Sequence, residues 1–287
     1  MSEALFRIHG ARGSHPVFGP SMTKYGGHTT CFSLETERSF LIFDAGSGIS
    51  DVNKIIAGTA ANKKVTLFFS HFHLDHLLGL MGLKMLYEPD SAIEICGASP
   101  ESDESMREVL SAFFSPRLWP VPLESMAADI QYHEIDARGG ERAMDDVTVR
   151  WQVIPHTQLC LSYRLQMPGG SITIATDHEP SPESVGSFVD FTRGADLLIQ
   201  DAQYTPEEYA TRAGWGHGTW VDAARIANDA KVGRLVLTHH DPDHSDQDLD
   251  GILRQTRAAF SSTSLAKDGL AFRFNPSTVQ FETAILR

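Results

Sequence analysis

The sequence predicts an α/β fold, and three observations favour it. The run Val65–Phe69 is short, apolar and β-favouring, as expected of a buried strand. A turn joins it to Leu77–Tyr87, an apolar segment that we expect to form a helix packed into the core. Further short apolar runs and segments of helical periodicity follow along the chain. Hydrophobic residues make up 41% of the 287 positions, which is enough for a sizeable core.

Short apolar runs mark the strands in chain order. Residues 31–35 and 39–43 alternate like the two arms of a hairpin, and Pro168-Gly169-Gly170 supplies a turn between two later strands. The same criteria predict strands over residues 5–9, 31–35, 39–43, 65–69, 93–97, 129–135, 147–153, 161–167, 171–176, 195–200 and 234–238.

Helical spacing and proline positions define the remaining segments. Residues 101–114, 220–229 and 249–261 have helical periodicity. Three prolines exclude regular structure from residues 115–122. With its aromatic side chains, segment 113–122 is either a lid over a pocket or a loop packed on the core, and the second interpretation is favoured. Because no linker, repeat or low-complexity tract interrupts the pattern, we expect one domain spanning residues 1–287.

The composition narrows the classes of partner. A formal net charge of −13 argues against a broad electrostatic contact with nucleic acid, but it is compatible with a small phosphate ester held by metal ions. Three widely spaced cysteines favour buried free thiols over disulfides or a thiolate zinc site. Neither a signal peptide nor a run long enough to span a bilayer is visible, so we expect a soluble, cytoplasmic protein without membrane contact.

Four metal-binding side chains lie within six residues after the strand at 65–69: His71, His73, Asp75 and His76. Alternate side chains of extended backbone share a face, so His71 and His73 can reach one cation together. Asp75 and His76 lie past the bend and can serve a second cation nearby. Imidazole and carboxylate suit Zn²⁺, with Mn²⁺ or Fe²⁺ as alternatives. A chance cluster of surface histidines is the competing explanation, and it does not account for histidines between a buried strand and an apolar segment.

Five apolar strands end in His or Asp, at Asp44, at His71, near His156, at Asp177 and at His239. Such residues at matching strand ends can converge on one rim of a sheet, as a metal site assembled from distant segments requires. Asp44 is either a turn-forming residue or an acceptor that orients a ligating histidine. His28 lines a pocket or occupies a turn, and the turn is favoured.

The stretch HFHLDH at residues 71–76 resembles the HxHxDH signature of the metallo-β-lactamase superfamily. His156 in PHT, Asp177 in ATDHE and His239 in LTHHDP match the later family positions in order. The resemblance implies a four-layer αβ/βα sandwich with two divalent metal ions at one edge. It assigns His71, His73 and His156 to the first metal, Asp75, His76 and His239 to the second, and Asp177 to both. His240 competes with His239, and the family pattern favours His239.

The segments GGHTTC at 26–31, QDA at 200–202 and GHGT at 216–219 are similar to the phosphodiesterase branch of that superfamily, although His28 stands where asparagine is usual. This branch implies that a hydroxide bridging the metals attacks the phosphorus of a small, cyclic nucleotide or ribose phosphodiester. Asp75 would orient or deprotonate the nucleophile, His217 would protonate the leaving alkoxide, and Asp201 would orient His217.

Several alternatives remain open. They are a lactonase or thioesterase on the same fold, a ribonuclease Z-like nuclease, and a non-catalytic metal-binding domain. Since no inserted basic, glycine-rich arm is visible, tRNA is not expected as substrate, and a homodimer stays open.

Overall fold

The computed structural model describes residues 3–60, 62–99, 104–275 and 278–285. Within these residues the strands form two sheets, of eight and seven strands. The first has the order β15-β14-β1-β2-β3-β4-β5-β6, with bounds Thr278–Ile285, Leu270–Asn275, Ala4–Gly10, Cys31–Glu35, Ser39–Phe43, Lys64–Phe68, Ala92–Gly97 and Asp129–Glu134. The second has the order β13-β12-β11-β10-β9-β8-β7, with bounds Thr263–Leu265, Arg234–Thr238, Leu197–Asp201, Gly170–Ala175, Cys160–Met167, Val147–Ile154 and Gly140–Met144.

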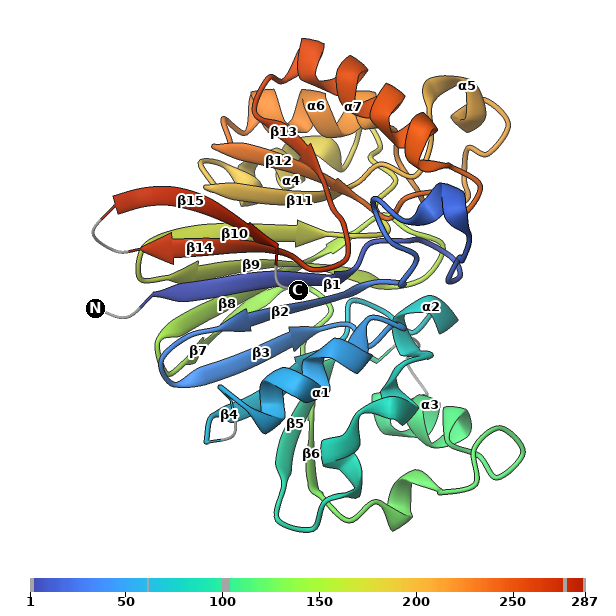
Figure 1. Cartoon of the computed structure of the whole chain (residues 1–287), viewed down its shortest axis with the longest axis vertical. Coiled ribbons are helices and arrows are strands. Elements are labelled where there is room, and N and C mark those ends of the chain that lie inside the picture. Colours follow the sequence, from blue (N-terminus) through green and yellow to red (C-terminus); the bar gives the residue numbers. More distant parts are fainter. Residues whose placement is uncertain (1–2, 61, 100–103, 276–277, 286–287) are drawn as a thin grey trace.

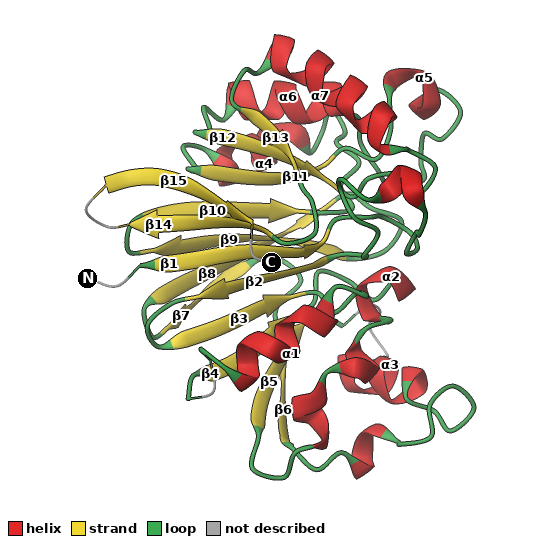
Figure 2. Ribbon diagram, in the orientation of Figure 1, coloured by secondary structure: helices red, strands yellow, loops and turns green. Residues whose placement is uncertain are grey.

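Helices cover the outer face of each sheet, as Figures 1 and 2 show. On the first sheet lie α1 (Ile49–Ala57), the short α2 (Leu74–Leu77) and α3 (Met106–Phe113). On the second lie α4 (Val185–Thr192), α6 (Trp220–Asp229) and α7 (Asp246–Ala259), and the short α5 (Pro206–Tyr209) stands at the end of that layer. The expected four-layer αβ/βα sandwich is therefore confirmed. No helix in the described part of the chain has the length and apolar character needed to cross a bilayer.

The side chains of β3 explain why the layers pack in this way. Leu41 and Phe43 point into the core between the two sheets, whereas Phe40 and Ile42 pack beneath the helices of the first outer layer. Successive side chains of a strand point to opposite faces, so a strand that is apolar on both faces requires cover on both sides. All three cysteines are free and buried, as the sequence predicts.

The prediction of a helix over Leu77–Tyr87 is wrong. Helix α2 ends at Leu77, and two separate 3₁₀ turns follow, Leu80–Gly82 and Lys84–Tyr87. Gly79 passes so close to the backbone of Gly46 that an added Cβ would lie 2.0 Å from the Gly46 carbonyl oxygen. The chain therefore bends at Gly79, where glycine also lowers helix propensity. Leu77, Leu80, Leu83 and Leu86 still reach the core.

Other boundaries also differ from the prediction. Helix α3 begins at Met106, after the cap Ser105, and residues 101–103 lie outside the described part of the chain. Helices α1 and α4 and the edge strand β7 were not expected. Segment 113–122 packs on the core: Phe114 is fully buried, and the Trp119 indole donates to the Tyr87 hydroxyl at 2.9 Å. The lid interpretation is therefore not supported.

Candidate metal centre

The expected site residues follow strands that end at the same edge of the sandwich. Strands β3 and β4 are parallel, as are β10, β11 and β12, and β8 runs in the same direction as β10 because both are antiparallel to β9. Parallel strands deliver their carboxyl ends to one edge. The loops that follow β4, β8, β10 and β12 therefore bring distant parts of the sequence together there (Figure 1).

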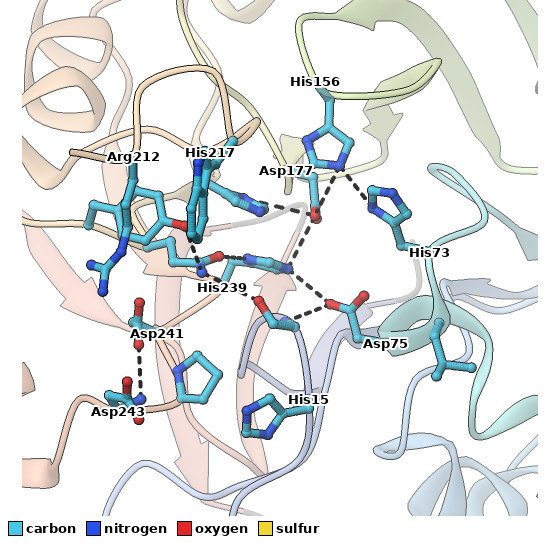
Figure 3. Close-up of a pocket in the computed structure, with 16 residues that line it drawn as sticks. His15, His73, Asp75, His156, Asp177, Arg212, His217, His239, Asp241 and Asp243 are labelled. Atoms are coloured by element: carbon cyan, nitrogen blue, oxygen red, sulfur yellow. Dashed lines mark hydrogen bonds and ion pairs between the residues drawn. The ribbon is translucent and has the colours of Figure 1, made fainter. Parts of the chain in front are cut away.

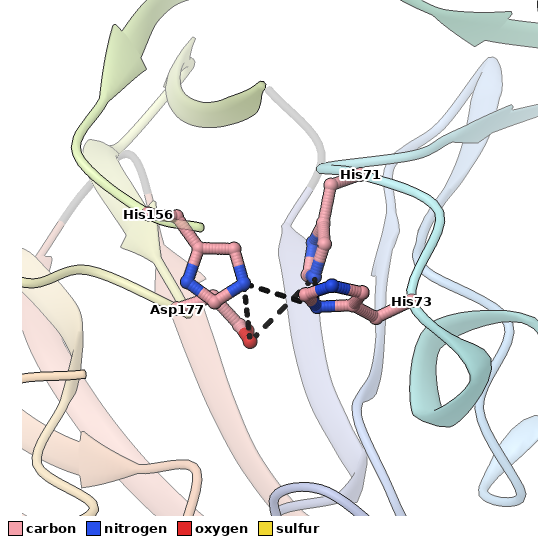
Figure 4. Close-up of side chains that lie close together, drawn as sticks. All are labelled: His71, His73, His156 and Asp177. Atoms are coloured by element: carbon pink, nitrogen blue, oxygen red, sulfur yellow. Dashed lines mark hydrogen bonds and ion pairs between the residues drawn. The ribbon is translucent and has the colours of Figure 1, made fainter. Parts of the chain in front are cut away.

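The first group of side chains consists of His71, His73, His156 and Asp177 (Figure 4). His73 Nδ1 lies 3.0 Å from Nε2 of His71 and 3.0 Å from Nε2 of His156. Asp177 Oδ1 lies 3.6 Å from His71 Nε2 and 3.7 Å from His156 Nε2. Three imidazole nitrogens and one carboxylate oxygen thus surround a common point.

The second group consists of Asp75, His76, Asp177 and His239. His239 Nε2 lies 3.2 Å from Asp75 Oδ2 and 3.3 Å from Asp177 Oδ1, as Figure 3 shows. His76 Nε2 lies 3.4 Å from Asp75 Oδ2 and 3.1 Å from Asp177 Oδ2. Because Asp177 belongs to both groups, the two groups are adjacent.

Surrounding groups fix the orientation of the imidazoles. Asp44 Oδ2 lies 2.9 Å from His76 Nδ1, and the Asp44 carboxylate also accepts the backbone N–H and hydroxyl of Ser70, each at 2.8 Å. This geometry favours the orienting role of Asp44 over that of a simple turn residue. His239 Nδ1 lies 2.9 Å from Gln203 Oε1, a partner that the sequence analysis missed. An acceptor on one ring nitrogen leaves the other free to bind a metal.

His156 is oriented by a glycine. Its Nδ1 lies 2.8 Å from the carbonyl oxygen of Gly216. Gly216 has φ 89°, and an added Cβ would lie 2.2 Å from His156 Nδ1. Both the backbone conformation and the close approach therefore require glycine at this position.

The electrostatics of the two groups differ. Burial lowers the pKa of His71, His73 and His156, so these imidazoles are neutral and can offer lone pairs. Burial opposes protonation of His239 too, but Asp177 and Asp75 outweigh it and raise its pKa to about 9. The pKa of His76 is likewise raised well above its usual value, mainly by Asp177.

The two carboxyls show the reciprocal effect. Burial alone would raise the pKa of Asp75 and of Asp177, but the neighbouring imidazoles hold both well below their usual range. The backbone N–H of Ser14 also donates to Asp75 Oδ2 at 2.9 Å. The second group thus joins two buried carboxylates to two histidines whose pKa values those carboxylates raise.

These residues fit divalent cations on two grounds. Neutral imidazoles and carboxylates are the donors that Zn²⁺, Mn²⁺ and Fe²⁺ accept. His76 Nε2 and Asp177 Oδ2 lie 3.1 Å apart as an ion pair, but they do not form a hydrogen bond with each other or with another group of the described chain. Buried polar atoms are rarely left without a partner, and a cation shared between these two would supply one. A cation would also place positive charge beside the two carboxylates of the second group.

His217 lies beside the two groups and is held from several sides. Its Nδ1 lies 2.8 Å from Asp201 Oδ2, and its ring stacks on that of His239 with centroids 4.7 Å apart. The ring of Tyr204 meets it edge-on at 5.9 Å. Nε2 of His217 makes no hydrogen bond within the described chain, and the residue lines the pocket. Asp201 is thus placed to orient His217, with Nε2 open to the pocket.

The pocket over these residues has a volume of about 490 Å³. Its wall includes five side chains that the sequence analysis did not single out: Ser14, Gln203, Tyr204, Arg212 and Asp241. Gln203 and Tyr204 follow β11 and Asp241 follows β12, whereas Ser14 and Arg212 lie on loops that approach from elsewhere in the chain. Gln203 and Asp241 carry a sequence signal, since each follows a strand-end residue, Asp201 or His239, by two positions.

Glu179 is a further residue that the sequence analysis missed. Its Oε1 accepts the Tyr209 hydroxyl and the Gly214 N–H, and its Oε2 accepts the Gly216 N–H, all at 2.7 Å. One carboxylate thus joins the end of β10 to the loop that carries His217. Helix α6 begins directly after that loop. A capping box between Thr219 and Asp222 at the start of the helix fixes the far end of the loop.

Two other candidates lie apart from the pocket. His28 Nδ1 lies 3.1 Å from the Ser47 hydroxyl, and the residue lies outside the pocket in the irregular segment 26–28, after the turn at residues 23–25. His240 Nε2 lies 2.9 Å from the Ala266 carbonyl oxygen, so it is His239 and not His240 that joins the cluster.

Comparison with known proteins gives the same fold. The family model described as a β-lactamase superfamily domain matches residues 41–240. A ribonuclease Z of Treponema pallidum is 24% identical over 85% of this chain and 91% of its own length. The metallo-β-lactamase fold protein YhfI from Bacillus subtilis superposes with a TM-score of 0.72 at 20% identity, covering 95% of this chain and 100% of that one. A diphosphatase from the PhnP family superposes with a TM-score of 0.69 at 19% identity, covering 96% of this chain and 98% of that one.

Proposed function

Because this chain belongs to the β-lactamase superfamily, we propose that it is a metal-dependent hydrolase that cleaves phosphodiesters and acts as a single domain. The observation that carries the proposal is His217, which Asp201 orients beside two adjacent groups of metal-binding side chains. A ring held in this way can donate a proton to a leaving oxygen. The ribonuclease Z relatives and the PhnP-family diphosphatase, whose names denote hydrolysis of phosphate bonds, support the same class of reaction.

Two divalent cations are the proposed cofactors, with Zn²⁺ the first choice and Mn²⁺ or Fe²⁺ as alternatives. His71, His73, His156 and Asp177 would hold one, and Asp75, His76, Asp177 and His239 the other. When bound, such cations neutralise charge on the phosphate oxygens and make water more acidic.

The chain's own residues have separate tasks in this proposal. Asp75, held by the Ser14 N–H, orients the attacking water and accepts its proton. His217 delivers a proton from Nε2 to the leaving oxygen, and Asp201 keeps the ring in that orientation through Nδ1. The buried His156 and His239 rings border His217, which limits the room for competing water.

A small phosphodiester is the proposed substrate, with a cyclic nucleotide or cyclic ribose phosphate as the first choice. A pocket of about 490 Å³ accommodates one small ligand. The net charge of −13 disfavours a long polyanion, whose binding needs many basic side chains.

A ribonuclease Z-like nuclease is the second candidate. The ribonuclease Z of Treponema pallidum aligns along most of both chains, which favours it. A lactonase or thioesterase would use the same metal-binding residues and is separated from both by its substrate alone.

The test is a substrate panel assayed with Zn²⁺ and with Mn²⁺. It contains bis(p-nitrophenyl) phosphate, 2′,3′- and 3′,5′-cyclic nucleotides, a structured RNA with a single-stranded 3′ extension, and a lactone. We expect the chain to hydrolyse the phosphodiesters and to lose this activity when a chelator is added. Among them, a cyclic nucleotide should be hydrolysed faster than the RNA. Hydrolysis of the lactone without hydrolysis of any phosphodiester would contradict the proposal.

A further inference from the structure

One arginine stands in a pocket wall that also carries four carboxylates. Among the described residues that line the pocket, Asp75, Asp177, Asp241 and Asp243 carry carboxylates, and Arg212 is the side chain that is always positively charged. Asp75 and Asp177 belong to the metal centre, whereas Asp241 and Asp243 lie on the loop after β12 (Figure 3). Away from the metal centre, Arg212 is therefore the permanent positive charge that would attract a negative group of the substrate.

The guanidinium of Arg212 is presented without a carboxylate partner. No ion pair within 4 Å joins it to any carboxylate of the described chain, including Asp241. It lies over the Tyr204 ring instead, 5.0 Å from the ring centroid. Stacking on an aromatic face holds a guanidinium while leaving its N–H groups available for a planar or tetrahedral oxyanion.

The backbone that carries Arg212 is held in place. The Arg212 N–H donates to the Tyr209 carbonyl at 2.9 Å, and Glu179 binds both the Tyr209 hydroxyl and the Gly214 N–H. An arginine held before the ligand arrives loses less conformational entropy on binding.

Tyr204 also sets the distance between Arg212 and the reaction. Its ring carries Arg212 over one face and meets the His217 ring edge-on, so a single aromatic ring separates the guanidinium from the proposed proton donor. A group bound at Arg212 therefore lies about one ring away from the phosphodiester that His217 would act on.

We propose that Arg212 is a specificity-determining residue that binds a second anionic group of the substrate, a phosphate or carboxylate, next to the scissile phosphodiester. This inference rests on the proposed function and narrows its substrate class to diesters with an additional negative group. Charge-assisted hydrogen bonds of this kind contribute about 10- to 100-fold in affinity.

The catalytic arm of the test compares adenosine 2′,3′-cyclic phosphate with its 5′-phosphorylated derivative, because the two share the same leaving oxygen. The measured quantity is the ratio of their kcat/KM values. We expect the wild-type ratio to favour the phosphorylated substrate about tenfold or more, mainly through KM. Arg212→Gln should abolish the preference, and Arg212→Lys should restore part of it. The matched control is Arg225→Gln, because Arg225 is exposed on α6 and pairs with Asp222 outside the pocket.

A binding arm is independent of turnover. Calorimetry on the metal-loaded chain compares adenosine 3′-monophosphate with adenosine 3′,5′-bisphosphate. The inference is supported if the wild type and Arg225→Gln bind the bisphosphate more tightly than the monophosphate and Arg212→Gln does not. This result would stand even if no diester is hydrolysed and the proposed function fails. Equal binding of both ligands by the wild type, or a bisphosphate preference that survives Arg212→Gln, overturns it, even where the enzyme is an active phosphodiesterase.

Discussion

Replacing His217 by glutamine should separate proton donation from metal binding. The side chain is outside both groups of proposed metal-binding residues that share Asp177, and its Nδ1 is engaged by Asp201 at 2.8 Å. Stacking on His239 and edge contact with Tyr204 hold the ring from two further directions. A proton donor fixed in this way contributes about 10²- to 10⁴-fold to the rate, or about 3 to 5 kcal/mol in the barrier.

The magnitude should depend on the leaving group. An alkoxide, as released from a 3′,5′-cyclic nucleotide, needs the proton, whereas p-nitrophenoxide leaves without one. We therefore expect His217→Gln to lower kcat by about 10²-fold or more for the cyclic nucleotide and by about tenfold or less for bis(p-nitrophenyl) phosphate. Asp201→Asn, which keeps the shape but removes the charge, should show the same leaving-group dependence with a smaller loss.

The assay needs steady-state kinetics on both substrates and metal analysis of each variant. Metal content equal to that of the wild type is the control for an intact centre. Equal losses on the two substrates would refute proton donation by His217, as would full activity of His217→Gln on the cyclic nucleotide.

Three more predictions address the surroundings of the site. Asp44→Asn should weaken the binding of one of two cations about 10- to 100-fold, because Asp44 orients His76; chelator competition measures this, and unchanged affinity would argue against that role. Glu179→Gln cannot accept all three 2.7 Å bonds, so the Gly216 amide should exchange hydrogen faster and kcat should fall about tenfold, and an unchanged exchange rate would contradict the clamp. Burial lowers the pKa of His9 from 6.5 to about 4. The fold therefore keeps its full stability above pH 6.5, where His9 is neutral in both states, and loses stability as the pH falls from 6.5 toward 4, because the unfolded chain then binds a proton that the folded chain does not. Between pH 7.5 and pH 5, urea unfolding should show the wild type losing ~2 kcal/mol more than His9→Gln, and parallel pH curves would exclude this.

Local pattern was sufficient for much of the fold. The apolar runs that predict β3, β4 and β10 appear as buried strands within a residue or two of the expected bounds. The residues that follow them, among them His71 and Asp177, meet at one edge because parallel strands share an orientation. In each case the apolar run and the site residue that predict this arrangement lie within a few positions of each other in the sequence.

Long-range partners were beyond the same pattern. Glu179 and Arg212 are ordinary charged residues in the sequence, and their places depend on a loop that folds back from α5. Leu80, Leu83 and Leu86 do reach the core, but the close contact between Gly79 and Gly46 replaces the expected helix by 3₁₀ turns. The periodicity of apolar residues indicates which side of a segment is buried. It does not indicate which distant part of the backbone packs against that segment.

The backbone itself shows that the centre is organised by the chain. Six described non-glycine residues have positive φ, and four of them, Ser14, Asp44, Asp177 and His239, bind or belong to the cluster. This conformation costs about 1 to 2 kcal/mol per residue, least for Asp and Asn, whose side chains can bond locally. At Asp44, Asp177 and His239 it follows a strand by one or two residues and interrupts the alternation of side chains at the strand end. Backbone strain of this kind persists only where the surrounding structure imposes it, so the fold itself directs these side chains toward the cluster.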